Sequence, residues 1–247
     1  MRYLVLTDIH ANLEALDACL IDARGRGYDA TLVLGDLVGY GADPNAVVER
    51  VQDLEPMAIV RGNHDKVACG LEPPEGFNAV AKSAVRWTSE VLTSEHRDWL
   101  AALPQGPQSV DDFVEICHGS PYDEDAYIFD ELDALRALKA STRALCLFGH
   151  THYPAAFELS EGTFDSIGPA ASAETRLPLR DAVKYLLNPG SVGQPRDGNP
   201  RAAYAIVDAG AKRVDLFRLI YPVEVAQAKV LKAGLPEVLA QRLGMGR

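Results

Sequence analysis

Short apolar runs alternate with helical patterns over the first two thirds of the chain. The apolar runs, which predict strands, lie at 2–8, 30–36, 57–63, 112–120 and 143–150. A helix is predicted at 12–27, where apolar residues recur every three or four positions. A second helix is predicted at 43–54, with Asp43 as its N-cap and Pro44 at its first helical position. This alternation predicts an α/β fold.

The pattern changes in the rest of the chain. A longer helical region at about 78–103 is predicted to form two helices with a break near Thr93. Beyond it, alternating apolar and polar positions predict a meander of short strands that forms a second sheet, with runs at 153–161, 162–168, 183–189, 201–209 and 212–221. From about 222 we expect two helices separated near Gly234 and Pro236.

Polar residues that can bind protons or metal ions stand at the end of each predicted strand in the first two thirds. They are Asp8, Asp36, Asn63, His118 and His150. In α/β folds, ligands bind at the carboxyl ends of the strands, so we expect these side chains to meet at one edge of a sheet. Histidines are concentrated there as well, since of the six in the chain only His96 lies inside a helical pattern. The sequence therefore predicts a functional site at this edge.

Two pairs of residues have a spacing that suits metal binding. Residues i and i+2 of an extended segment point to the same side, so Asp8 with His10, and His150 with His152, can each present two ligands to one point. Taken alone, each motif has an ordinary explanation: a surface HxH pair, a turn at GNHD, or a core histidine at 118. Occurring together at strand ends, they predict a metal site. Imidazole and carboxylate ligands suit Mn, Fe, Zn, Co or Ni.

The motifs and their order resemble those of a known family. DIH at 8–10, GD at 35–36, GNHD at 62–65, the histidine at 118 and GHTH at 149–152 are similar to the motifs of the calcineurin-like metallophosphoesterase superfamily. The stretches GDLVGYGADPN and NPGSVGQPRDGNPRAAYAI resemble its small prokaryotic branch of phosphoesterases and phosphatases. One departure is Ala11, which stands where many relatives have glycine and which we expect to be tolerated.

The resemblance covers nearly the whole chain and implies a fold. It implies a single α/β domain over residues 1–247, built as an α/β/β/α sandwich of two mixed sheets flanked by helices. The chain also contains no repeat, low-complexity tract or linker. The helical region at about 78–103 is then an insertion, and the helices from about 222 form a C-terminal extension.

The resemblance also implies two divalent metal ions and their ligands. One ion is expected on Asp8, His10, Asp36 and His152, and the other on Asp36, Asn63, His118 and His150, so that Asp36 bridges them. Manganese is the expected metal, with Fe, Zn, Co or Ni as alternatives. The implied reaction is the hydrolysis of a phosphoester, by a phosphatase or a phosphodiesterase, in which a metal-bound hydroxide attacks phosphorus.

Further residues are implied to act on the substrate. By resemblance, His64 is the general acid that protonates the leaving oxygen. We expect Asp65 to hold its imidazole in the required tautomer, as carboxylates do in other proteins. Arg196 is the expected phosphate contact, because a guanidinium matches phosphate bidentately, and Arg61 and Arg201 are alternatives.

Net charge narrows the range of partners. The formal net charge is −11, which disfavours long nucleic acids and anionic membranes and makes a nuclease an alternative rather than the main prediction. A small phosphorylated substrate is compatible, since two divalent cations outweigh two aspartates and a hydroxide. A catalytically weak protein-binding scaffold on the same fold is the other alternative, although such proteins tend to lose catalytic positions that are complete here. A homo-oligomer is also compatible with the sequence.

The cysteines and the N-terminal residues indicate the compartment. The four cysteines are scattered, form no CxxC pair and mostly lie in apolar runs, so we expect reduced core residues. Asp8 interrupts the first apolar run too early for a signal peptide or a membrane span. We therefore expect a cytoplasmic protein with no membrane association.

Overall fold

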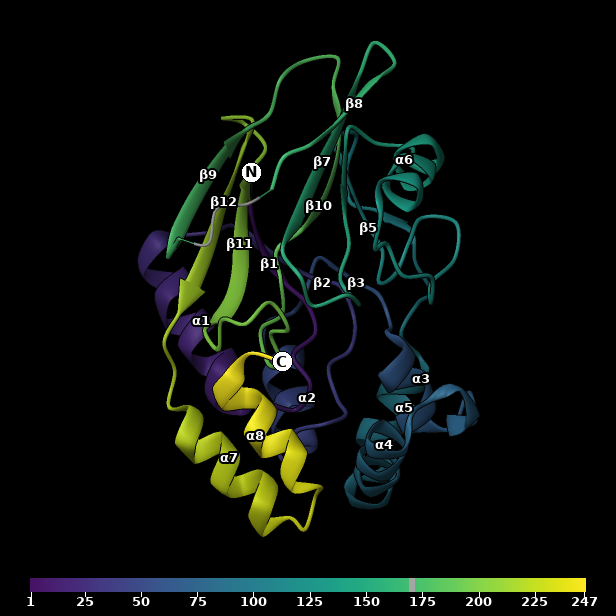
Figure 1. The fold of residues 1–247 in the computed structure, drawn as a ribbon, viewed down its shortest axis with the longest axis vertical. Helices are drawn as coiled ribbons and strands as arrows, with labels where there is room; N and C mark the ends of the chain where they lie inside the picture. Colours follow the sequence, from purple (N-terminus) through teal and green to yellow (C-terminus); the bar gives the residue numbers. More distant parts are fainter. Residues whose placement is uncertain (169–171) are drawn as a thin grey trace.

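Two mixed sheets lie face to face at the centre of the computed structural model, which describes residues 1–168 and 172–247 (Figure 1). The first sheet has the order β3 (Ala58–Ile59), β2 (Ala30–Val33), β1 (Arg2–Leu6), β11 (Ala202–Asp208), β12 (Arg213–Leu219) and β9 (Glu174–Pro178). The second has the order β4 (Gln108–Ser109), β5 (Val114–Ile116), β6 (Leu145–Leu147), β10 (Lys184–Asn188), β7 (Ala155–Ser160) and β8 (Thr163–Ser166). Strands β1, β2 and β3 run parallel, as do β5, β6 and β10.

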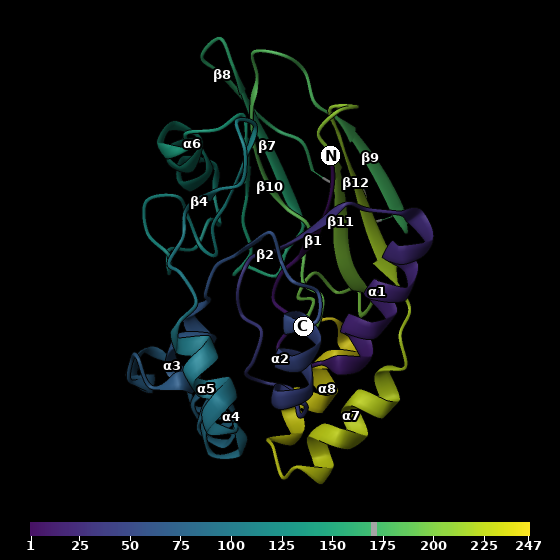
Figure 2. The same ribbon diagram turned by 180° about the vertical axis from the view of Figure 1, so that it is seen from behind.

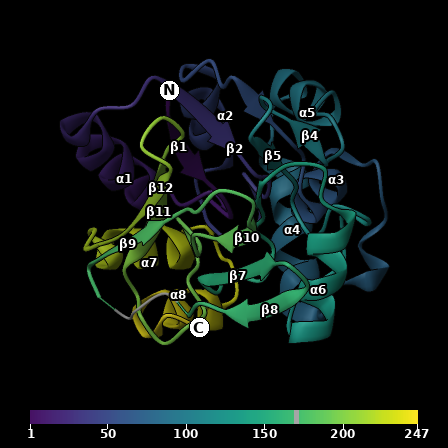
Figure 3. The same ribbon diagram turned by 90° about the horizontal axis from the view of Figure 1, so that it is seen from above.

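Helices cover the outer faces of both sheets (Figure 2). On the side of the first sheet lie α1 (Leu13–Arg26), α2 (Pro44–Gln52), α4 (Ala79–Val91), α5 (Ser94–Ala101), α7 (Val223–Lys232) and α8 (Glu237–Met245). Helix α6 (Glu131–Ala140) packs on the outer face of the second sheet, so that α1 and α6 lie on opposite sides of the molecule (Figure 3). Helix α3 (Asn63–Cys69) and a short 3₁₀ turn (Pro74–Gly76) follow β3.

Alternation along the strands explains this layering. In β1, Tyr3 and Val5 face the second sheet and pack against residues of β5 and β6, whereas Leu4 and Leu6 pack against the helices. A third cluster of apolar residues lies between the second sheet and α6. The order of layers is α/β/β/α, which confirms the expected fold class.

Several local predictions are confirmed. Thr93 separates α4 from α5, and its hydroxyl accepts a hydrogen bond from the backbone N–H of His96 (3.2 Å). The two C-terminal helices are separated at the expected glycine and proline. Asp43 stands at the N-cap position of α2, but its carboxylate binds Lys229 of α7 (2.7 Å) instead of capping the helix. All four cysteines are free. No helix in the described part of the chain has the length and hydrophobicity that a membrane span requires.

The predicted distribution of strands between the sheets is wrong. The C-terminal strands do not form a second sheet by themselves: β7, β8 and β10 join β4 to β6, whereas β9, β11 and β12 join β1 to β3. The first five predicted strands are likewise divided between the two sheets. Alternation shows which face of a strand is buried but not which strand lies beside it, and this partner is set by long-range pairing such as that of β1 with β11. The pattern also missed α3, α6, β4 and β9.

Candidate metal centre

The predicted ligands lie where the strands of the two sheets end. Asp8 follows β1, Asp36 follows β2, His118 follows β5 and His150 follows β6, whereas Asn63 is the first residue of α3 and not the end of a strand. Two hydrogen bonds join the sheets at this point. The Nδ1 of His118 donates to the carbonyl oxygen of Leu34 (2.7 Å), and the N–H of His150 donates to the carboxylate of Asp8 (3.1 Å). The site therefore spans both sheets, rather than one sheet edge.

The first group of ligands contains Asp8, His10, Asp36 and His152, all buried, with ligand atoms within 4.8 Å of one another. The Nδ1 of His10 bonds to the carbonyl oxygen of Val38 (3.0 Å), and that of His152 bonds to the carbonyl oxygen of Gln194 (2.6 Å). Because a carbonyl can only accept, both Nδ1 atoms carry the proton of a neutral ring. The two Nε2 atoms then face each other across 3.1 Å with lone pairs only, an arrangement that a bound cation stabilises.

The second group contains Asp36, His118 and His150, and shares Asp36 with the first. The Nε2 of His118 lies 3.4 Å from the Asp36 carboxylate and 3.3 Å from the Oδ1 of Asn63, so the Asn63 side chain lies beside this group. The Nε2 of His150 donates to the carbonyl oxygen of Asp125 (3.0 Å), which leaves Nδ1 as its ligand atom. The structure thus brings all seven predicted ligands together.

Burying the charged side chains of this site without a cation is unfavourable in free energy. It raises the pKa of Asp8 to about 7 and lowers the pKa of His10 and His152 well below the ordinary value. Burial also opposes the ionisation of Asp36, but the neighbouring His118 holds the pKa of this carboxyl well below its usual range. Buried charges are normally paired or bound to metal. Both groups consist of carboxylate and imidazole donors, and such donors fit divalent metal ions.

The backbone at the ligands is strained. Asp8, His10, Asp36, His150 and His152 all have positive φ angles, between 50° and 66°. This left-handed conformation costs an L-residue about 1–2 kcal/mol, and such strain gathers at functional sites. Ala11 shares it, with a φ of 52°, which explains why glycine suits this position.

His64 lies in an aromatic pocket beside the ligands. The centroid of its ring is 4.4 Å from that of Tyr40, 4.5 Å from Phe77 and 4.9 Å from His10. Its buried Nδ1 has no hydrogen-bond partner among the described residues. Burial lowers the pKa of His64 to about 4, so its imidazole is neutral before an anion binds. A Cβ on Gly39, whose φ is +89°, would meet Nδ1 at 2.5 Å, so only glycine fits against this ring.

Asp65 does not hold the imidazole of His64, contrary to expectation. Its Oδ1 accepts from the backbone N–H groups of Leu37 (2.9 Å) and Val38 (3.2 Å), and its Oδ2 accepts from that of Gly62 (2.9 Å). Both oxygens are therefore committed to backbone. Asp65 ties the loop after β2 to the start of α3 and in this way fixes the segment that carries His64.

The three candidate arginines lie in different surroundings. Arg196 is next to the site, with its guanidinium 5.8 Å from the ring centroid of Tyr40 and bonded to the Oε1 of Gln194 (3.1 Å). Arg61 makes a bidentate pair with Glu124, with both bonds at 3.0 Å, so it is not free to bind phosphate. Arg201 lines a separate cavity. The geometry favours Arg196 among the three.

Residues without an assigned role in the sequence analysis also build the site. The Nδ2 of Asn188 donates to the carbonyl oxygen of Gly149 (2.8 Å), and the hydroxyl of Ser191 donates to that of Asp8 (2.8 Å). Both belong to the NPGSVG stretch, which resembles the family without indicating a role for either residue. Tyr127, which no sequence signal identified, stacks on His150 with ring centroids 3.8 Å apart.

Comparisons with known proteins agree with this site. The calcineurin-like phosphoesterase superfamily domain matches residues 1–212. The protein MJ0912 of Methanocaldococcus jannaschii is 38% identical over 253 residues, which cover 98% of this chain and 97% of that protein. The crystal structure of a metallophosphoesterase from Sphaerobacter thermophilus is 38% identical with a TM-score of 0.87, over 100% of this chain and 99% of that one. Protein PH1004 of Pyrococcus horikoshii OT3, 21% identical, has the same fold with a TM-score of 0.79, over 100% and 98% of the two chains.

The family match spans most of the chain, and these relatives align with it almost from end to end. The two ligand groups contain the aspartates and histidines of DIH, GD and GHTH together with His118. The chain belongs to the calcineurin-like phosphoesterase superfamily, a family of metal-binding phosphoester hydrolases.

Proposed function

We propose that the protein hydrolyses a small phosphoester with two divalent metal ions, manganese being the expected metal. The observation that carries this proposal is the position of Asp36, whose carboxylate belongs to both ligand groups at once. Asp8, His10 and His152 would complete one site, and Asn63, His118 and His150 the other. When bound there, two such ions acidify a shared water and stabilise the oxygens of an in-line displacement at phosphorus.

The residues of the chain supply the rest of the reaction. The oxygen of water forms a bond to phosphorus, the bond from phosphorus to the ester oxygen breaks, and the leaving oxygen takes up a proton. We assign the donation of this proton to His64, because it lies beside the ligands without a competing hydrogen-bond partner. The negative charge of a bound phosphate would raise the pKa of this imidazole towards neutrality.

Asp65 and Arg196 have supporting roles in this proposal. Asp65 is a positioning residue, since it acts on His64 through the backbone of the segment that it ties down. Arg196 would bind the phosphate oxygens, because its guanidinium lies beside Tyr40 and has no carboxylate partner among the residues that the structure describes. We also expect a cytoplasmic location, in line with the sequence.

The test is the hydrolysis of para-nitrophenyl phosphate and bis-para-nitrophenyl phosphate by metal-stripped protein titrated with Mn²⁺. We expect activity to appear as about two equivalents bind, and to vanish in Asp36→Asn. Asp112→Asn is the matched control, because Asp112 is exposed and remote from the ligands. The ratio of the two rates distinguishes a phosphatase from a phosphodiesterase. Metal binding with no hydrolysis of either compound would favour the scaffold alternative.

A further inference from the structure

A large cavity connects the metal centre with helix α8. The cavity has a volume of ≈ 990 Å³, and its walls include Tyr40, Tyr127 and Arg196 as well as Arg242 of α8. Tyr40 and Tyr127 are the residues that contact His64 and His150, so the cavity adjoins the metal ligands. It is far larger than a single phosphate group requires.

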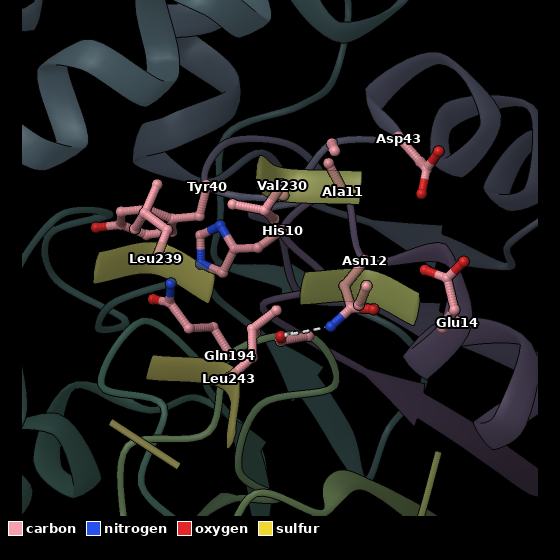
Figure 4. A pocket seen from close by; sticks show the side chains of 14 residues that line it. His10, Ala11, Asn12, Glu14, Tyr40, Asp43, Gln194, Val230, Leu239 and Leu243 are labelled. Atoms are coloured by element: carbon pink, nitrogen blue, oxygen red, sulfur yellow. Dashed lines mark hydrogen bonds between the residues drawn. The ribbon is translucent and has the colours of Figure 1, made fainter. Parts of the chain in front are cut away.

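The other side of the metal centre is closed. There, His10 and Tyr40 pack against Val230, Leu239 and Leu243 of the C-terminal helices (Figure 4). The space between them is ≈ 10 Å³, about the room that one water molecule needs. Of these two spaces, the larger cavity is the one with room for a substrate.

The cavity is cationic although the chain is acidic. Three arginines line it, namely Arg196, Arg242 and Arg247. Among the described residues, neither Arg196 nor Arg242 has a carboxylate partner, in a chain with 35 acidic and 24 basic side chains. The carboxylate in the wall belongs to Asp197, which is already paired with Arg218. Arginines left without carboxylates around a cavity favour the binding of anions.

The cavity also presents aromatic side chains. Tyr153 and Tyr127 are 46% and 42% exposed, and both line it. Phe129 stacks on Tyr127 with a centroid distance of 4.7 Å and an interplanar angle of 8°, which extends the stack that begins at His150. Both faces of Tyr127 are covered in this stack, so Tyr153 presents the exposed aromatic face in the cavity, and such a face binds flat rings such as nucleic acid bases.

We propose that this cavity binds the non-reacting part of a nucleotide that carries at least two phosphate groups. The terminal phosphate would react at the metal ligands: the oxygen of water bonds to its phosphorus, the bond to the bridging oxygen breaks, and that oxygen leaves with the nucleoside phosphate and takes up a proton from His64. Arg242 binds the phosphate that remains on the nucleoside, and Tyr153 stacks on the base. Arg242 lies beyond residue 212, where the family match ends, so α8 determines the specificity of this chain rather than its chemistry. The substrate class rests on the proposed function, whereas binding to the cavity does not.

The first test is binding of two probes to metal-stripped protein, measured by calorimetry. The probes are AMP, with one phosphate, and α,β-methylene-ADP, with two phosphates and no cleavable bond between them. We expect the second probe to bind about 10- to 100-fold more tightly, the gain from a charge-assisted bond to arginine. Arg242→Ala should abolish this difference, Arg242→Lys should restore part of it, and Arg24→Ala, an exposed arginine of α1, should retain it. Equal affinities for the two probes, or no binding of either, would overturn the proposal.

The second test is hydrolysis by the Mn²⁺-loaded protein. Arg242→Ala should lower kcat/KM for ADP by about 10- to 100-fold and leave para-nitrophenyl phosphate unchanged. Fructose 1,6-bisphosphate, which has two phosphates and no base, should be a poorer substrate than ADP. An equal loss on ADP and para-nitrophenyl phosphate, or a preference for the sugar, would contradict the nucleotide assignment. If no compound is hydrolysed but the binding difference holds, the proposed function fails and the anion site stands.

Discussion

Replacing Lys66 with methionine should destabilise the protein and weaken metal binding. Lys66 is buried, with its side chain 1% exposed, and its ammonium binds Asp125 (2.6 Å), Glu72 (2.9 Å) and Glu124 (3.1 Å). Methionine keeps the apolar stem and removes the charge. The three carboxylates would then lie close together without the ammonium. Arg61, which contacts Glu124, would be the remaining cation.

The expected loss follows from how exposed each partner is. Glu124 is 11% exposed, so its bond to the ammonium contributes about 1.5–3 kcal/mol. Asp125 and Glu72 are 43% and 47% exposed, and such pairs contribute about 0–1 kcal/mol each. The free energy of unfolding should therefore fall by about 1.5–5 kcal/mol. In a chain of this size each kcal/mol lowers Tm by about 2–4 °C.

Urea denaturation of the wild type, Lys66→Met and Lys139→Met measures this loss. Lys139 is an exposed lysine of α6, so its variant controls for the loss of one charge. A Lys66→Met protein within about 0.5 kcal/mol of this control would refute the reasoning. A second measurement is Mn²⁺ affinity, because Asp125 also accepts the bond that orients His150, and we expect weaker binding at that ligand group.

The pH dependence provides an independent check. Burial opposes the ionisation of Glu124, but the hydrogen bonds from Arg61 and Lys66 hold the pKa of its carboxyl below the ordinary value. A carboxyl with a lowered pKa stabilises the fold fully at neutral pH, and this stability is lost as pH falls through the lowered pKa. The stability difference between the wild type and Lys66→Met should therefore shrink on acidification. A difference that grows at low pH would show that the ion pair is not its cause.

Three further predictions test the site. His64→Ala should lower activity by roughly 10²–10⁴-fold on alkyl phosphoesters and far less on a nitrophenyl ester, whose leaving group needs no proton, whereas equal losses would count against the acid role. Gly39→Ala should lower the free energy of unfolding by at least about 1–2 kcal/mol, because it forces an L-residue to a φ of +89° and places a Cβ against His64. In the same urea assay Gly25→Ala, whose Cβ would meet nothing within 4 Å, should be neutral or slightly stabilising. Mn²⁺ at about 100-fold over its Kd should raise the free energy of unfolding by about 2.7 kcal/mol in the wild type and by much less in Asp36→Asn. A wild-type Tm that does not change when Mn²⁺ is added would argue against both ligand groups.

The sequence by itself indicated most of the local elements and the seven candidate ligands. Strand ends, helix breaks at Thr93 and at Gly234, and the DIH and GHTH motifs depend on residues close together in the chain, so their patterns are visible without a fold. The seven residues predicted as ligands came from the order of these motifs, and the structure brings their side chains together. The fold class followed from the same resemblance.

The tertiary structure alone decided which residues meet. Alternation cannot choose a strand's neighbour, so the division of the strands between two sheets was not predictable. The partners of Asp65, the commitment of Arg61 to Glu124 and the burial of Lys66 depend on side-chain geometry that no motif records. Likewise His10 faces His152, 142 positions away, and Arg242 reaches the cavity from the far end of the chain. Such contacts arise when the sheets and helices pack into layers. Packing brings together side chains that are far apart in the sequence, and no local sequence pattern reveals which of them will touch.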